Sequence, residues 1–177
     1  MKPWITFFSQ TGSDIYNVSQ ALKKEPDVII TNKPMDEIDT INPDLLDRYF
    51  DRILFLPKKP TIEEYQTAIP EDSIVTLHGW LRIVPSEICE MFEIYNLHPA
   101  PLSKYAFLKG KDPQVRTYEM KLEYAGNTIH KCTPELDSGE ILAENFYAVG
   151  DRNLDEQFKE THKKASELWC TFLEDKL

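Results

Sequence analysis

The sequence predicts an α/β fold, in which a mostly parallel β-sheet is covered by helices on both faces. Short apolar runs bounded by turn residues recur along the chain, and segments with helical spacing of apolar residues separate most of them. The 177 residues are 41% hydrophobic, which is enough to bury a core. Because no repeat, low-complexity tract or linker is evident, we expect a single domain over residues 1–177.

Seven of the apolar runs are expected to be strands because they are short, rich in β-branched and aromatic residues, and end at turn residues. The segment Thr31-Asn32-Lys33-Pro34, for example, closes the second run. The predicted strands are 4–8, 28–30, 52–56, 73–77, 93–97, 128–132 and 141–149.

The intervening segments have helical patterns, and proline at the first turn of 85–92 favours a helix start there. The last helix opens near Asn153, and its apolar stripe continues to Phe172. The stretches 36–42 and 98–112 are expected to be irregular. The first predicted helix begins after the loop at 10–14 and ends at about residue 24. The other predicted helices cover 43–50, 61–68, 85–92, 113–121 and 153–172.

Composition excludes several classes of protein. A formal net charge of −10 argues against nucleic acid as a partner, although a helix N-terminus can still hold a small anion. The three cysteines are widely spaced, so neither a disulfide framework nor a metal site is expected. No signal segment or membrane-spanning run is evident, and we therefore expect a cytoplasmic protein that does not bind membranes.

Ligands of such sheets bind beyond the carboxyl ends of the strands, which directs attention to the loops that follow them. In the first loop, Gly12 permits a tight turn, and Ser13 or Asp14 can cap the next helix and present its N–H groups to a phosphate. Spacing alone favours an ordinary helix cap over a phosphate site.

A second loop follows the strand at 73–77 and contains Gly79 and a single arginine, Arg82, among apolar residues. This composition suits a slot for a flat heterocycle, or equally a plain turn made of core residues.

The third loop carries the most informative pair. Asn96 and His98 are two residues apart at a strand end, so their side chains point to the same side. Pro99 and Pro101 stiffen the chain just beyond. An amide donor beside an imidazole suits acyl transfer, while a polar pair bonded to its own loop is about as plausible.

The fourth loop follows the strand at 128–132 and contains Asp137, with Gly139 as its turn residue. Loop aspartates are usually solvated, so Asp137 by itself indicates little. His130 either faces a site or has its hydrogen bonds satisfied locally on a half-buried strand, and the second interpretation is favoured.

Together and in this order, the four loops resemble the folate-dependent formyltransferases, most closely the glycinamide ribonucleotide transformylase branch. The most specific match is Asn96-Leu97-His98-Pro99 with a downstream Leu136-Asp137-Ser138-Gly139. Supporting matches are Gly12-Ser13-Asp14, Thr31-Asn32-Lys33, 79–84, Leu102 with Lys104-Tyr105, and 126–139.

The resemblance implies a Rossmann-like formyltransferase catalytic domain that uses N10-formyltetrahydrofolate and no metal. It implies that Asn96, His98 and Asp137 are catalytic. It also implies that Gly12, Ser13, Asp14 and Pro99 bind an amine acceptor, with the first three facing its phosphate or an equivalent polar group. The residues implied to hold the folate are Leu81, Arg82, Ile83, Val84, Cys132, Thr133, Pro134 and Glu135.

The acceptor implied is a small, phosphorylated amine such as glycinamide ribonucleotide in purine biosynthesis. The length and the acidic charge argue against a tRNA acceptor. Alternatives are an amino-sugar nucleotide or amino-modified nucleotide acceptor, hydrolysis of formyltetrahydrofolate, and a non-catalytic folate- or nucleotide-binding module. Ser103 replaces the proline that the family carries after Leu102, and no residue of the last helix is assigned to the acceptor.

Overall fold

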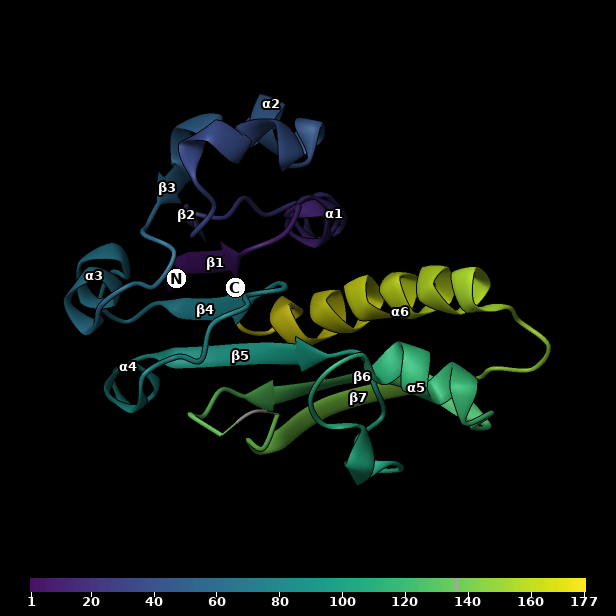
Figure 1. The fold of residues 1–177 in the computed structure, drawn as a ribbon. Helices are drawn as coiled ribbons and strands as arrows, with labels where there is room; N and C mark the ends of the chain where they lie inside the picture. The colour runs from purple at the N-terminus through teal and green to yellow at the C-terminus, as the bar shows by residue number, and fades with distance from the viewer. Residues whose placement is uncertain (136) are drawn as a thin grey trace.

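The computed structural model describes residues 1–135 and 137–177 and confirms the predicted α/β fold. A seven-stranded sheet has the order β3-β2-β1-β4-β5-β6-β7 (Figure 1). Strands β1 to β5 pair in parallel, whereas β6 and β7 pair antiparallel. The strands are β1 (Trp4–Phe8), β2 (Val28–Thr31), β3 (Ile53–Phe55), β4 (Ile74–Leu77), β5 (Glu93–His98), β6 (Tyr124–Lys131) and β7 (Ile141–Ala148).

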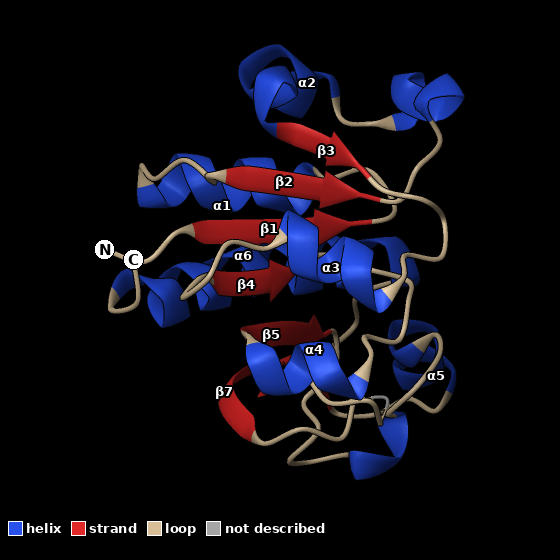
Figure 2. Cartoon of the chain, turned by 90° about the vertical axis from the view of Figure 1, so that its left-hand side faces the viewer, coloured by secondary structure: helices blue, strands red, loops and turns tan. Residues whose placement is uncertain are grey.

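Helices cover both faces of the sheet. Figure 2 shows α3 and α4 in front of the strands, and α1 and α6 behind them. The α-helices are α1 (Ser13–Leu22), α2 (Pro43–Tyr49), α3 (Ile62–Ala68), α4 (Ser86–Met91), α5 (Pro113–Glu119) and α6 (Leu154–Glu174).

The structure corrects the sequence prediction at four segments. The expected loop at 36–42 contains the 3₁₀ helix η1 (Met35–Thr40), and the stretch at 98–112 contains another, η3 (Ala106–Leu108). A third, η2 (Phe50–Arg52), ends the predicted second helix. Strand β6 begins at Tyr124 rather than at Thr128, because pairing with β7 extends along its whole length.

Local sequence explains where the helices begin. The Asn42 side chain accepts hydrogen bonds at the start of α2, and Pro43 occupies the first turn. Thr61 and Glu64 form a reciprocal capping box at the start of α3. Such caps each stabilise a helix by about 1 kcal/mol. Within the described residues, no helix is long and apolar enough to cross a membrane.

The alternation of β5 decides which side chains face which layer. Ile94 packs in the core cluster beneath α3 and α4, whereas Tyr95 and Leu97 pack in the cluster against α6. Because alternate residues of a strand share a face, Asn96 and His98 lie on the side of α3 and α4. The carboxyl end of β5 therefore carries polar groups on one face of the sheet and an apolar wall on the other.

Candidate active site

The antiparallel neighbour of β5 completes one side of the site. Asn96 pairs in register with His130, and His98 pairs with Thr128. Directly opposed residues share a face of the sheet, so β6 brings His130 to Asn96. His130 Nε2 lies 3.4 Å from the Asn96 amide nitrogen.

Asp137 reaches this cluster from the loop after β6, with 6% of the residue exposed. Its Oδ1 lies 3.2 Å from His98 Nδ1 and 3.7 Å from His130 Nε2. Its Oδ2 accepts a hydrogen bond of 2.9 Å from the Gly110 N–H. Burial alone raises the pKa of this carboxyl, but contacts from His130 and His98 outweigh it and hold the pKa well below its usual range.

The ring of His98 is held at both ends. Its Nε2 lies 2.7 Å from the Leu108 carbonyl oxygen, and its Nδ1 faces Asp137. A carbonyl and a carboxylate are both hydrogen-bond acceptors, so each ring nitrogen of His98 faces an acceptor.

The contacts of His130 correct the interpretation favoured from the sequence. Its Nδ1 lies 3.1 Å from the Lys131 carbonyl oxygen, as expected for a histidine satisfied on its own strand. Its Nε2, however, faces Asn96 and Asp137. Periodicity on one strand could not reveal these contacts, because they depend on the register with β5 and on the path of a distant loop.

Two features of the backbone, a positive φ at Asp137 and a close approach at Gly139, accompany the placement of the Asp137 side chain beside His98. Asp137 has φ 53°, in the left-handed region that costs a residue with a Cβ about 1 kcal/mol or more. Gly139 lies so close to the end of β6 that an added Cβ would be 1.6 Å from the Lys131 carbonyl oxygen. Leu136, the first residue of the Leu-Asp-x-Gly match, lies outside the described residues.

A glutamate of β7 builds the corner after His98, where the sequence departs from the family pattern. The Glu144 carboxylate accepts hydrogen bonds from the Ser103 backbone N–H at 3.0 Å and from the Ser103 hydroxyl. It also accepts one from the Thr128 hydroxyl at 2.8 Å. Serine thus ties the corner to the sheet through a donor that proline lacks.

The segments implied to hold the folate divide into exposed and buried residues. Leu81 and Ile83 are 65% and 66% exposed, and they flank the exposed Arg82. Val84 and Cys132 are instead buried in the core cluster beneath α3 and α4. Their side chains therefore pack against the core, while Leu81, Arg82 and Ile83 of the first segment face outward.

The rest of the second segment lies at the surface. Pro134 and Glu135 are exposed, and the Thr133 hydroxyl donates to the Glu135 carbonyl oxygen at 3.0 Å. These residues precede Asp137, so the same loop carries the proposed folate contacts and the buried carboxylate.

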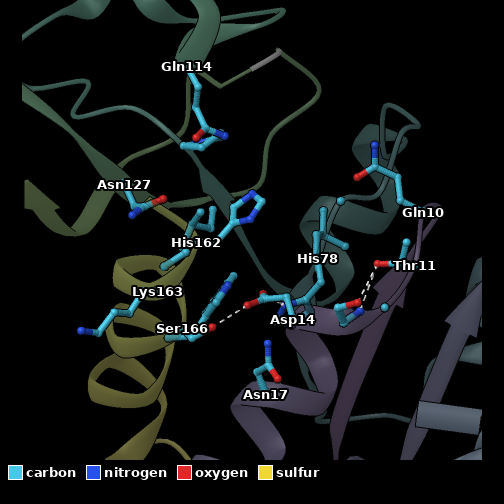
Figure 3. A pocket seen from close by; sticks show the side chains of 18 residues that line it. Gln10, Thr11, Asp14, Asn17, His78, Gln114, Asn127, His162, Lys163 and Ser166 are labelled. Carbon is cyan, nitrogen blue, oxygen red and sulfur yellow. Dashed lines mark hydrogen bonds and ion pairs between the residues drawn. The ribbon is translucent and has the colours of Figure 1, made fainter. Parts of the chain in front are cut away.

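On the opposite face of the sheet, a cavity of about 370 Å³ brings together the four residues implied to bind the acceptor (Figure 3). Gly12, with φ 74°, caps α1 beside Ser13 and Asp14, and Pro99 closes the cavity from the end of β5. Leu97 also lines it.

Helix α6 contributes to this cavity residues that the sequence analysis did not assign. His162, Lys163 and Ser166 line it, and the Ser166 hydroxyl donates to Asp14 Oδ1 at 3.1 Å. Their spacing on a closing helix resembles any solvated helix face, so only the packing of α6 against α1 reveals them. Among the described residues, no group of His, Cys, Asp and Glu is arranged to hold a metal ion.

Comparison with known proteins agrees with the fold. The chain is similar to the phosphoribosylglycinamide formyltransferase structure from Anaplasma phagocytophilum, with a TM-score of 0.81 and 21% identity, covering 97% of this chain and 85% of that one. The structure of glycinamide ribonucleotide transformylase 1 from Geobacillus kaustophilus gives a TM-score of 0.81 at 19% identity, over 100% and 99% of the two chains.

Sequence comparison reaches the same family. The methionyl-tRNA formyltransferase of Thermotoga maritima is 30% identical over 120 residues, which are 66% of this chain but 37% of that protein. This chain thus corresponds to little more than a third of that relative. The family model described as formyl transferase matches residues 5–171. The chain therefore belongs to the formyl transferase family.

Proposed function

We propose that residues 1–177 form one catalytic domain that transfers the formyl group of N10-formyltetrahydrofolate to the amine of a small acceptor. The observation that carries this proposal is the cluster of half-buried Asn96 with the buried His98 and Asp137, in which an amide donor and an imidazole lie beside an ionised carboxylate. Acyl transfer needs this set, because negative charge develops on the acyl oxygen while the attacking amine loses a proton.

Each member of the cluster has a separate task. The Asn96 amide donates a hydrogen bond to the formyl oxygen as its negative charge grows, and the His98 ring donates a second one once its Nε2–H turns from the Leu108 carbonyl oxygen toward the formyl oxygen. Asp137 stabilises the charge on His98 from 3.2 Å and receives the proton of the attacking amine, directly or through a water molecule. The new bond joins the amine nitrogen to the formyl carbon, the bond from that carbon to N10 of the folate breaks, and the proton taken from the amine passes on to N10.

His130 supports this arrangement from β6. Since its Nε2 contacts the Asn96 amide nitrogen, it limits rotation of the amide, whose second N–H can then point toward the formyl oxygen. Preorganised donors of this kind cost little rearrangement during the reaction.

The residues on the α3 and α4 face fit a formyl-folate donor, which supplies the activated formyl group when bound. Exposed Leu81 and Ile83 offer apolar area for the flat pterin ring, and Arg82 lies between them. Burial of such apolar side chains against a ring contributes about 25 cal/mol per Å². We also assign contacts with the pterin to residues 133–135 and to the segments that contain the buried Val84 and Cys132.

The cavity on the α1 and α6 face is the proposed acceptor site, because it ends against Leu97 and Pro99 on either side of His98. Structural neighbours bear the name phosphoribosylglycinamide formyltransferase, so glycinamide ribonucleotide is the first acceptor to test. The formyl group would then pass between the two faces at the carboxyl end of β5.

The test is to incubate the protein with N10-formyltetrahydrofolate and a panel of amines, and to follow tetrahydrofolate release. We expect release that depends on an amine, and its loss in Asn96→Ala and His98→Ala variants that retain the wild-type circular dichroism spectrum. Release of formate without any amine would favour hydrolysis, and absence of release with every amine would refute the proposal.

A further inference from the structure

A chain of buried hydrogen bonds fixes Asp14 inside the acceptor cavity. The indole N–H of Trp4 donates to Thr76 Oγ1 at 2.9 Å, and Thr76 Oγ1 lies 2.7 Å from His78 Nε2. On its other side, His78 Nδ1 donates to Asp14 Oδ2 at 2.6 Å. The side chain of His78 is fully buried, so Asp14 is held by the core rather than by solvent.

Asp14 keeps binding capacity despite these contacts. Its Oδ2 receives one hydrogen bond from His78 and its Oδ1 one from Ser166, while each carboxylate oxygen can accept about two. About a third of its side chain, 34%, remains exposed. Asp14 is therefore an immobilised acceptor of hydrogen bonds that can still receive donors from a ligand.

A second acceptor of hydrogen bonds lies across the cavity. The Asn145 amide nitrogen donates to the Lys164 carbonyl oxygen, which leaves Asn145 Oδ1 to accept from the Asn127 amide nitrogen at 3.3 Å. The Asn127 amide nitrogen also donates a hydrogen bond to the Thr161 carbonyl oxygen at 3.0 Å. Both bonds fix the orientation of Asn127, so its Oδ1 faces the cavity, buried and without a donor within the described part of the chain.

The charges around the cavity do not suit a phosphate at the start of α1. A phosphate on the N–H groups of Ser13 and Asp14 would lie beside the Asp14 carboxylate, and like charges at such short range repel strongly. Figure 3 shows the ammonium group of Lys163 directed away from Asp14.

From these contacts we propose that the acceptor amine carries hydroxyl groups, as a sugar ring does, and donates them to Asp14, with no phosphate bound at the N-terminus of α1. Two neighbouring hydroxyls match the two free positions on the carboxylate. Asp14 then selects hydroxylated, unphosphorylated amines over phosphorylated ones. This inference rests on the proposed function and narrows its acceptor.

Two acceptors that differ only in the phosphate test the proposal: glycinamide ribonucleotide and the corresponding ribonucleoside. For the wild-type protein we expect kcat/KM for the ribonucleoside to exceed that for the ribonucleotide by about tenfold or more. Asp14→Asn keeps the shape of the side chain but removes its charge, and should reverse this preference. The matched control is Asp44→Asn, which removes an exposed charge from the first turn of α2 and should leave the preference unchanged.

The ratio of kcat/KM for the two acceptors in the wild-type protein tests the proposal even if the Asp14→Asn variant does not fold. A wild-type preference for the ribonucleotide overturns the proposal, as does an unchanged preference in a folded Asp14→Asn variant. Failure of the proposed function looks different, because no amine then releases tetrahydrofolate. In that case ligand-observed NMR of the same two probes on wild-type protein applies: tighter binding of the ribonucleoside supports the proposal, and tighter binding of the ribonucleotide, or of neither, overturns it.

Discussion

Replacing Asp137 by asparagine removes the charge that links His98, His130 and the Gly110 backbone while keeping the size of the side chain. In the wild-type protein these groups lie 3.2, 3.7 and 2.9 Å from the carboxylate oxygens. Because Asp137 is buried, water does not replace the lost interactions.

The expected cost follows from these contacts. A hydrogen bond to a charged group contributes about 1.5–3 kcal/mol and a neutral one about 0.5–1.5 kcal/mol. The hydrogen bond from Gly110 therefore loses about 1 kcal/mol when the charge disappears, and the contacts to the His98 and His130 rings lose the attraction of the carboxylate charge. We expect Asp137→Asn to lower the free energy of unfolding near neutral pH by about 2–4 kcal/mol, since the exchange also leaves His98 without its partner charge.

Urea denaturation of both proteins as a function of pH measures this effect. The pKa of Asp137 is lower in the folded protein than its value of about 3.9 in an unfolded chain. A lowered pKa stabilises the folded state fully above the unfolded value, and the contribution is lost as the pH falls through the folded value. The difference between wild type and variant should therefore stay level from about pH 8 to 5 and shrink below about pH 4.

Two results would refute this reasoning. Equal free energies of unfolding near neutral pH would show that the carboxylate is not held by the contacts described. A difference that grows as the pH falls below about 4 would show that the pKa of Asp137 is raised on folding rather than lowered.

Four further substitutions separate effects on catalysis from effects on stability. His98→Ala and Asn96→Ala should each lower kcat for formyl transfer by about 10²-fold or more in protein that retains the wild-type circular dichroism spectrum, and near-wild-type turnover would exclude that residue from catalysis. Gly126→Ala places a Cβ 2.1 Å from the Asn145 carbonyl oxygen, so we expect a loss of about 2 kcal/mol or more in thermal unfolding; unchanged stability would mean that β7 moves aside. Thr61→Ala removes the cap of α3 and should lower Tm by about 2–4 °C with kcat unchanged, whereas an activity loss would couple α3 to the site.

Much of the fold could be predicted from the sequence because strand and helix patterns are local. The run at Trp4–Phe8 and the turn at Gly12 have the expected structure, since apolar runs and positive φ at glycine depend on near neighbours. The 3₁₀ helix at Met35–Thr40 was missed because its sequence has no apolar periodicity, and no residue in it is buried.

The candidate site was predictable in part. The pairing of Asn96 with His98 follows from the two-residue period of a strand. The approach of Asp137 was implied by the resemblance alone, because a loop 39 residues after His98 leaves no local signal. Ser166 was not predictable, since it meets Asp14 only through the packing of the last helix on the first.

The pairing of β6 with β7 shifts register between Ile129 and His130. Side chains on a strand alternate between faces, so deleting one residue near this shift would exchange the environments of Ile129 and His130. An imidazole would then enter the apolar layer under α6, and an isoleucine would stand beside Asn96. Transplanting the loop that carries Asp137 into a related scaffold therefore requires that the donor and recipient strands be matched at this irregularity, whatever the length of the loop itself.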